Sequence, residues 1–277
     1  MFPLRCPLCG KPLRLDGGSY RCENRHSYDC AKSGYVNLLD SSRKRSKIPG
    51  DNKLMSAARR DFLNKGYYEP LSDALNSVCL ARLSGSSSPV ILDAGCGEGY
   101  YTSRLAEAFS REGARPEILG IDISKFAADL AAKRCKAAAF AAASVFHLPV
   151  FDRACDLVLS LFAPYCGEEF LRVLKPGGLF VMAIPGRDHL WELKQAVYET
   201  PYKNEVRDYP LDGFEFLSAG KVETVLELSS REDILHLFEM TPYYYKTSKQ
   251  DQMRLEELDR LTVTASFELL IYQLKNK

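Results

Sequence analysis

The stretch Val90–Gly99 constrains the fold of this chain more than any other. It reads Val-Ile-Leu-Asp-Ala-Gly-Cys-Gly-Glu-Gly, and helical spacing follows over Tyr100–Phe109. The apolar start predicts a buried strand, and Gly95, Gly97 and Gly99 predict a loop that ligand atoms can approach closely. A strand that runs through such a loop into a helix N-terminus is a nucleotide-binding arrangement, because the helix start presents free N–H groups. We therefore expect a nucleotide site at this loop.

Extended and helical patterns alternate after the loop. Strand patterns occupy residues 117–122, 138–142, 156–160 and 179–183, and helical patterns occupy 125–134, 168–174 and 188–198, with a turn at 175–178. Strands that alternate with helices predict a parallel, doubly wound sheet whose ligands lie at the carboxyl ends of the strands. We therefore predict an α/β, Rossmann-like domain.

The segments on either side of this alternating part have their own patterns. Before the loop, residues 53–63 and 71–83 have helical spacing. The tail shows two extended patterns within 213–228, helices at 230–240 and 250–261, and a last strand at 263–274. These patterns predict a final hairpin at one edge of the sheet.

Three polar side chains follow predicted strands and meet at the same crevice. Asp93 ends the first strand, Asp122 ends the second, and Ser144 follows the third. Asp122 lies at the distance from the first strand that is typical of the carboxylate that binds ribose hydroxyls. The alternative is an ordinary helix N-cap, but Ser124 is available for capping. We therefore assign Asp122 to the nucleotide.

The N-terminus carries paired metal-ligand knuckles. Cys6 and Cys9 are followed, after twelve residues, by Cys22 and then by His26. Two ligands on one tight turn that face two on another assemble a tetrahedral zinc site, and four ligands favour a structural ion. Gly17-Gly18 between the pairs predicts a hairpin turn. The alternatives are reduced buried thiols, or Cys30 as the fourth ligand in place of His26.

The overall charge of +1 gives no global attraction to nucleic acid, so any such contact depends on local patches. One candidate is the basic run Ser41–Lys47, which is either a solvated linker or a phosphate-contacting segment. No apolar run of about 18 residues suggests a membrane helix, and no signal-peptide pattern opens the chain. We expect a cytoplasmic protein with no membrane contact.

Taken together, these motifs resemble the zinc-containing 23S rRNA (guanine-N1)-methyltransferases, including the macrolide-resistance type. The glycine loop and the Lys-Pro-Gly-Gly turn are common to many methyltransferases, whereas the zinc knuckle joined to Gly-Tyr-Val-Asn-Leu-Leu is more specific. The family can carry methionine at the position of Cys30, which weakens a ligand role for that residue. The segments that carry the resemblance are Cys6-Pro-Leu-Cys9, Cys22–His26, Ala31–Leu39, Pro49-Gly50-Asp51, Leu92–Thr102, Lys175–Gly178, Pro185-Gly186 with His189, and Met240-Thr241-Pro242.

The resemblance implies an enzyme that uses S-adenosylmethionine as methyl donor, holds Zn2+, and recognises a hairpin of 23S rRNA as a homodimer with a shared RNA cleft. It divides the chain into a zinc-binding RNA-recognition module (1–36), a basic linker with helices (37–88), and a Rossmann-like class I methyltransferase domain (89–277). Beside the loop, family contacts to the cofactor fall at Tyr68, Tyr101, Thr102 and His189. With these, the expected cofactor-binding residues are Tyr68, Asp93, Gly95, Gly97, Gly99, Tyr101, Thr102, Asp122, Ser144 and His189.

Two other functions remain open from the sequence. One is a small-molecule methyltransferase with a structural zinc ribbon, and the other is a non-catalytic RNA-binding protein that retains the fold. The general base is not assigned, since Glu168, Asp188 and His189 are candidates by position only. Phe162, Tyr165 and Tyr243–Tyr245 either stack on a target base or belong to the core.

Overall fold

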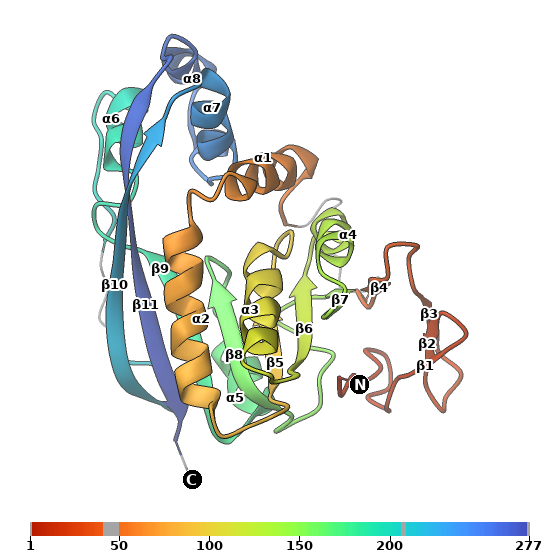
Figure 1. Cartoon of the computed structure of the whole chain (residues 1–277). Coiled ribbons are helices and arrows are strands. Elements are labelled where there is room, and N and C mark those ends of the chain that lie inside the picture. Colours follow the sequence, from red (N-terminus) through yellow and green to blue (C-terminus); the bar gives the residue numbers. More distant parts are fainter. Residues whose placement is uncertain (1, 41–49, 206–208, 276–277) are drawn as a thin grey trace.

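One mixed sheet organises the computed structural model, which describes residues 2–40, 50–205 and 209–275 (Figure 1). Its eight strands in this part of the chain lie in the order β10-β11-β9-β8-β5-β6-β7-β4. All neighbours from β9 to β4 are parallel, whereas β11 is antiparallel to both β9 and β10. The strands are β4 (Val36–Asn37), β5 (Val90–Ala94), β6 (Glu117–Asp122), β7 (Ala139–Ala142), β8 (Cys155–Leu161), β9 (Leu174–Pro185), β10 (Phe214–Leu228) and β11 (Leu261–Leu274).

Alternation of side chains along the strands gives the sheet two separate cores. Ile91 packs with helices α2, α3 and α4 on one face, and its neighbour Leu92 packs with α5 and the N-terminal module on the other. Both side chains are fully buried. The predicted α/β fold with parallel strands is therefore confirmed, and the predicted final hairpin is β10–β11.

Helices α1 and α7 lie above the carboxyl ends of the parallel strands, whereas α2 and α3 run along the sheet (Figure 1). Serine side chains at Ser124, Ser230 and Ser248 cap α4, α7 and α8 by accepting a backbone N–H. The helices are α1 (Lys53–Asn64), α2 (Glu69–Leu83), α3 (Tyr100–Arg111), α4 (Lys125–Arg134), α5 (Gly167–Val173), α6 (Trp191–Val197), α7 (Arg231–Glu239), the 3-10 helix η2 (Tyr244–Lys246) and α8 (Lys249–Glu256). Within the described residues, none of the helices is long and apolar enough to span a bilayer.

The N-terminal module is a small antiparallel sheet of β1 (Arg14–Asp16), β2 (Ser19–Arg21) and β3 (Ser27–Asp29). The predicted hairpin turn at Gly17-Gly18 is confirmed, with φ of 56° and 87° at the two glycines. Positive φ at both central residues is the requirement of the tight turn that matches strand twist.

The module is joined to the large sheet at two places. Leu4 forms an antiparallel bridge with Val150, and the Arg5 N–H donates to the Pro149 carbonyl at 2.9 Å. Strand β4 then pairs in parallel with β7 and becomes the last strand of the sheet. Because β4 covers residues 36 and 37, it spans the boundary that the sequence predicts between module and linker.

Four predicted elements differ from the structure by more than one or two residues at an end, or in their continuity. The turn at 175–178 lies inside one continuous strand, β9, where Gly177 has a φ of 72° and the register against β8 shifts. The helix predicted from residue 188 begins at Trp191, because Leu190 is left-handed and its N–H donates to the Thr264 carbonyl. The two extended patterns in 213–228 form one strand with a bulge after Phe216. The last helix ends at Glu256 rather than at 261, because Leu261 already pairs with β10.

Candidate functional site

A cavity of about 640 Å3 lies at the carboxyl ends of the central strands. The ends of β5, β6, β7, β8 and β9 contribute to its floor, and helix α1 and the segment after α7 contribute further walls. Eight of the ten expected cofactor residues line it: Tyr68, Asp93, Gly95, Gly97, Tyr101, Asp122, Ser144 and His189. The topology therefore brings together residues from widely separated parts of the sequence.

Asp93 is the buried acid of this cavity. Its side chain is 1% exposed, and one carboxylate oxygen accepts a hydrogen bond from the Thr102 hydroxyl at 2.6 Å. The other oxygen, Oδ1, has no partner among the described residues. Burial raises the pKa of Asp93 to about 6, against the opposing effect of Thr102. A buried carboxylate oxygen without a partner suits a cationic ligand.

Asp122 organises the glycine loop. Its carboxylate accepts from the Gly97 N–H at 3.0 Å and from the Ser124 N–H at 2.7 Å. Ser124 itself caps α4, as expected, so Asp122 is not the cap. The N–H groups of Gly95 and Cys96 both donate to the Ile121 carbonyl. Because three N–H groups of the loop are engaged by β6 and its end, the loop is not arranged to cradle a phosphate.

Two expected contacts lie one layer behind the cavity. The Thr102 hydroxyl donates a hydrogen bond to Asp93, and Gly99 faces helix α4 instead of the cavity. At Gly99 φ is 83°, and an added Cβ would lie 2.9 Å from Ala131. Only glycine therefore allows the loop and α4 to approach this closely, a packing role that differs from the expected ligand contact.

Three aromatic or imidazole residues that the family resemblance singles out meet the cavity with unpaired polar atoms. The hydroxyls of Tyr68 and Tyr101 and the Nδ1 atom of His189 are buried without a hydrogen-bond partner within the described ranges. Tyr68 packs edge-on against Phe267, with ring centroids 4.8 Å apart, and Phe267 also contacts His189. Unsatisfied buried polar atoms gathered in one cavity indicate a ligand that completes their hydrogen bonds.

Of the three candidate bases, only His189 lines the cavity. Asp188 pairs with Lys203 at 2.6 Å and lies outside it, as does Glu168 at the start of α5. Burial, followed by the nearby charge of Lys194, lowers the pKa of His189 to about 3. The imidazole is therefore neutral at physiological pH and offers Nδ1 as a hydrogen-bond acceptor or donor, depending on its tautomer.

One wall of the cavity is not predicted by the sequence. Gly50 and Asp51 line it, although they entered only as part of a family motif. Arg59 pairs with Asp51 and donates to the Met240 carbonyl at 2.8 Å, which joins α1 to the segment after α7. The Asp51 carbonyl accepts from the Ser124 hydroxyl at 2.8 Å. A local pattern cannot reveal these contacts because they join four separate segments.

The cavity fits S-adenosylmethionine, the donor that a methyltransferase domain implies. Its volume is in the range of small-molecule sites, and its acids can offset the positive charges of the donor. Asp93 provides the unpaired carboxylate oxygen, and Asp122 lies at the strand end suited to ribose hydroxyls. The residues present therefore fit this group.

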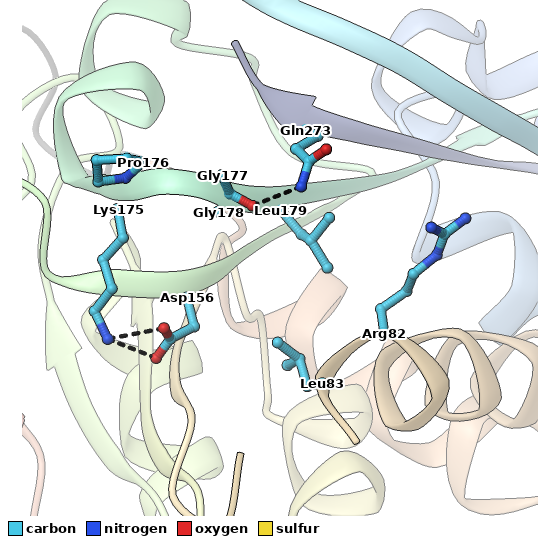
Figure 2. Close-up of a pocket in the computed structure, with 9 residues that line it drawn as sticks. All are labelled: Arg82, Leu83, Asp156, Lys175, Pro176, Gly177, Gly178, Leu179 and Gln273. Carbon is cyan, nitrogen blue, oxygen red and sulfur yellow. Dashed lines mark hydrogen bonds and ion pairs between the residues drawn. The ribbon is translucent and has the colours of Figure 1, made fainter. Parts of the chain in front are cut away.

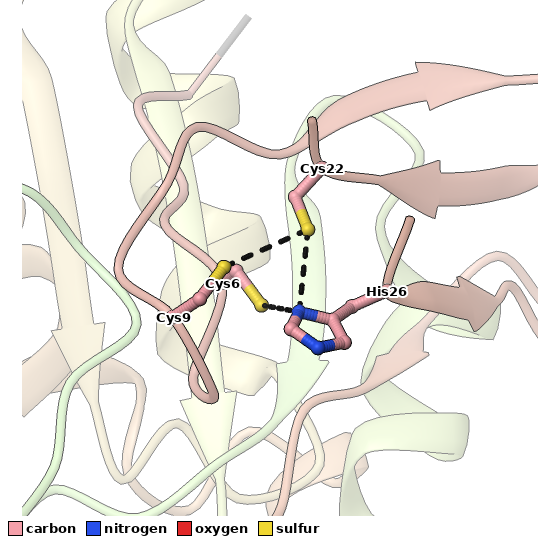
Figure 3. Close-up of side chains that lie close together, drawn as sticks. All are labelled: Cys6, Cys9, Cys22 and His26. Atoms are coloured by element: carbon pink, nitrogen blue, oxygen red, sulfur yellow. Dashed lines mark hydrogen bonds between the residues drawn. The ribbon is translucent and has the colours of Figure 1, made fainter. Parts of the chain in front are cut away.

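The second site is the metal cluster of the N-terminal module (Figure 3). Cys6, Cys9, Cys22 and His26 place one ligand atom each within 4.8 Å of all the others. The Cys9 and Cys22 sulfurs are 3.7 Å apart, and His26 Nδ1 lies 3.4 Å from the sulfurs of Cys6 and Cys22. Tetrahedral zinc with Zn–S bonds of about 2.3 Å separates its sulfurs by roughly 3.8 Å. The donor set and its spacing fit Zn2+, with Nδ1 as the histidine ligand.

The surroundings favour the thiolate of Cys6, whereas the pKa of Cys9 is raised by burial and by its neighbouring cysteines. Burial alone would raise the pKa of Cys6, but hydrogen bonds from the Tyr28 hydroxyl, at 3.2 Å, and from backbone groups outweigh it and lower the pKa to about 6. Thiolate is the form that binds metal. Cys30 is not part of the cluster, so the geometry favours His26 as the fourth ligand.

A smaller cavity of about 280 Å3 lies at the opposite, amino end of the parallel strands (Figure 2). Lys175 pairs there with both oxygens of Asp156 at 2.8 Å, and Gln273 donates to the Gly177 carbonyl at 2.9 Å. These polar groups are satisfied by one another, and ligands of such sheets bind at the carboxyl edge. The Lys-Pro-Gly-Gly segment is therefore structural.

Comparison with known proteins agrees with both sites. Residues 4–47 match the family model for the N-terminal domain of RlmA, a zinc ribbon, and residues 86–250 match a methyltransferase domain model. A 23S rRNA (guanine(748)-N(1))-methyltransferase of Streptomyces fradiae is 40% identical over 196 residues, which cover 70% of this chain and 67% of the relative.

Two further relatives match nearly end to end. Proteins of Bacillus subtilis (strain 168) and Micromonospora griseorubida, both assigned as 23S rRNA (guanine-N(1)-)-methyltransferases, are each 32% identical to the chain. The alignments cover 96% and 98% of this chain and 95% and 97% of the relatives. The same fold holds both a zinc-ligand cluster and the cavity of a methyltransferase domain. Together with this similarity, these features show that the chain belongs to the 23S rRNA (guanine-N1)-methyltransferase family.

Proposed function

We propose that this protein transfers a methyl group from S-adenosylmethionine to N1 of a guanine in a hairpin of 23S rRNA. The observation that carries the proposal is the combination, in one fold, of the cavity around Asp93 with a Cys3His module of the RlmA type. A small-molecule methyltransferase needs no such module, and a protein that only binds RNA needs no cavity of this kind. Both alternatives are tested by the experiment below.

Bound S-adenosylmethionine supplies a methyl group on a sulfonium sulfur, which makes that carbon electrophilic. In the transfer, guanine N1 would form a bond to this carbon while the carbon–sulfur bond breaks, and the N1 proton would leave to water or to a side chain. The products are N1-methylguanine in the RNA and S-adenosylhomocysteine. Correct alignment of the two reactants supplies up to about 7–11 kcal/mol of the barrier reduction.

The chain's own residues provide that alignment. Asp93 would face the cationic groups of the donor, and Asp122 would accept hydrogen bonds from its ribose. Ser144 lies beside the same cavity, after the end of β7. Tyr68, Tyr101 and His189 complete the contacts through their unpaired polar atoms. The neutral imidazole of His189 adds no positive charge against the sulfonium, and the largely apolar lining excludes water.

The N-terminal module supports the RNA assignment through its charge. Lys11, Arg14, Arg25 and Lys32 are exposed on it, and the basic run Ser41–Lys47, which lies outside the described residues, follows in the sequence. Phosphate contacts from such cations make RNA binding salt-dependent. Replacement of Lys11, Arg14 and Lys32 by alanine should weaken binding to the rRNA hairpin and flatten its salt dependence by about 0.7 per lost contact on a log–log plot. An unchanged salt slope would contradict this role.

The family resemblance also leads us to propose that the protein acts in the cytoplasm as a homodimer whose two modules form one RNA cleft. Light scattering should give twice the mass of 31.1 kDa, both free and with a bound hairpin. A monomer in both states would exclude the shared cleft.

Methyl transfer to 23S rRNA transcripts, followed by mass mapping of methylated guanines, tests the function directly. The expected result is one N1-methylguanine within a hairpin, also present in rRNA from cells that contain the protein and absent from cells that lack it. If the protein binds S-adenosylhomocysteine but transfers no methyl group to any rRNA hairpin, the proposal is wrong. No binding of that cofactor product would instead favour a non-catalytic RNA-binding protein.

A further inference from the structure

The cavity has two chemically different halves. The ends of β5, β6 and β7 carry the acids and the glycine loop that fit the methyl donor. The other half is built from the ends of β8 and β9 and from the segment after α7, and its lining is mainly apolar. It includes Phe162, Pro164, Ile184, Pro185, Pro242 and Tyr243. The acids and the glycine loop occupy the first half, whereas His189, which follows β9, and Tyr68 border the second through Phe267. The second half holds none of the acids, so it is where a neutral acceptor has room.

Phe162 is the unusual residue of this second half. Its side chain is 44% exposed, although it directly follows the buried strand β8. Its φ is 57°, in the left-handed region that phenylalanine rarely adopts. The Phe162 N–H donates to the Ala183 carbonyl at 3.1 Å, and its ring rests on Phe267 at 5.6 Å between centroids. Backbone strain that leaves an apolar ring facing a cavity is typical of functional positions.

The position of Phe162 relative to the donor half is fixed by its neighbour. A Cβ added at Gly95 would lie only 2.3 Å from the Cβ of Ala163, so the loop after β8 packs directly on the glycine loop. Phe162 therefore lies one residue from the contact between the two halves. A planar group resting on its ring would lie beside the donor site.

A second aromatic wall is held in place by a buried cation. The Lys194 ammonium lies 5.0 Å from the centre of the Tyr243 ring and donates to the Asn204 side chain at 2.7 Å. Lys194 is 1% exposed, and the Tyr243 hydroxyl approaches the same Asn204 oxygen at 3.4 Å. Burial raises the pKa of Tyr243 to about 12, so its ring stays uncharged at this wall.

We propose that Phe162 forms the face on which the target guanine stacks, within the apolar half of the cavity that Tyr243 also lines. The inference rests on the proposed function, which makes the acceptor a planar base in RNA. Enzymes that modify a base take it out of its stack, and an aromatic side chain in the active site replaces the lost stacking partner. Phe162 is thus a substrate-binding residue and makes no contact with the proton that leaves N1.

The test compares Phe162→Leu, Phe162→Tyr and the wild-type protein on 23S rRNA. Leucine keeps the apolar volume, and Leu190 shows that this chain accommodates leucine at a φ of 56°. Loss of the ring should lower kcat/KM for the RNA about tenfold to hundredfold, the usual effect of removing an aromatic stacking partner. Tyrosine, which keeps the ring, should retain activity within about threefold of wild type. Binding of S-adenosylhomocysteine, measured by calorimetry, should stay unchanged in both variants.

Phe216→Leu is the matched control. Phe216 is similarly exposed, at 42%, but lies on β10 and packs on Tyr209 and Tyr272 away from the cavity. Its replacement should leave kcat/KM unchanged. A Phe162→Leu variant with wild-type kcat/KM would overturn the assignment, as would one that loses cofactor binding, because Phe162 would then serve the donor. A wild-type protein inactive on every rRNA hairpin would overturn the proposed function and this assignment together.

Discussion

Burial raises the pKa of Asp93 to about 6, and burial also raises the pKa of Asp122 and of Glu98 in the same cavity. In the empty protein the folded state binds more protons than the unfolded chain between the ordinary value of about 3.9 and this raised value. The contribution of Asp93 to stability is therefore present at low pH and is lost as pH rises through this window. A cationic ligand favours the carboxylate and reverses the preference.

We therefore predict that binding of S-adenosylmethionine weakens as the pH falls below about 6, by up to about tenfold per pH unit, with proton release on binding. Calorimetry in buffers of different ionisation enthalpy measures both effects. Asp93→Asn should reduce the pH slope, with Asp122 and Glu98 left to titrate, and weaken binding roughly tenfold to hundredfold, because one charge-assisted hydrogen bond is lost. Asp73→Asn, on the exposed side of α2, is the control and should change neither. A dissociation constant independent of pH from 5 to 7 would contradict the role.

The sequence predicts some residues of the cavity better than others, and the reason is the range of the contacts. Asp93 and Asp122 could be predicted because each lies at the carboxyl end of a strand, so the parallel sheet alone brings them together. The roles of Gly99 and Thr102 depend on the approach of α4 and on the orientation of Asp93. Such contacts between elements have no periodic signal. Tyr68 and His189 entered only through the family resemblance.

At the scale of elements, the segment that carries the first zinc knuckle packs against the segment that follows β7, which forms one wall of the cavity. The segment before the first knuckle pairs with the strand-like residues 149–151, through Arg5 to Pro149 at 2.9 Å and Phe151 to Pro3 at 3.3 Å. Leu4 and Cys6 share a core cluster with Val145, which lines the cavity. Support for this wall therefore depends on the folded N-terminal module.

Removal of zinc should unfold the small sheet and loosen this wall. Structural zinc sites of this donor set supply folding energy directly, so the module loses its order with the metal. Hydrogen exchange should show faster exchange at Arg5 and Phe151 after chelation, while amides in β8 remain protected. Cys9→Ser should reproduce the effect, and Cys30→Ser, outside the cluster, should not. Unchanged protection at Phe151 in the metal-free protein would contradict this coupling.

Elements with repeated local signals were predictable, and the short or interrupted ones were not. Gly17-Gly18 predicted the turn of the β1–β2 hairpin, and the alternation of strand patterns with helix patterns predicted the parallel strands. Strand β4 has only two residues, too few for a pattern, and it exists because β7 offers an open edge. Helix α6 begins late because Leu190 is tied to β11, a contact distant in sequence.

At the scale of the whole molecule, the N-terminal module is part of the main core. Phe2, Leu4, Leu13 and Val36 are all buried in the cluster that also contains β7 and α5. Burial of such side chains contributes roughly 1.5–3 kcal/mol each. Typical domains have a net stability of only about 5–15 kcal/mol. The methyltransferase domain is therefore not independent of the residues before it.

Deletion of residues 1–36 should consequently lower the melting temperature by about 10 °C or more, or prevent folding. The physical reason is the exposed edge of β7 together with the uncovered Leu148 and Val150. Differential scanning calorimetry measures the shift. The Lys11, Arg14 and Lys32 alanine variant keeps the module and should melt within about 2 °C of wild type. A stable truncated domain with normal cofactor binding would show that the two parts are separable.

The pairing of β4 with β7 has a consequence for how the chain is made. Synthesis proceeds from the N-terminus, so the four zinc ligands are made before β7 and can bind metal together. Val36 can pair with Ala141 only after Ala141 has been made, about 100 residues later. At ordinary rates of elongation this takes roughly 5–20 s. The ribbon is therefore made before the strand that β4 pairs with, and this edge of the sheet forms only after β7 has been translated.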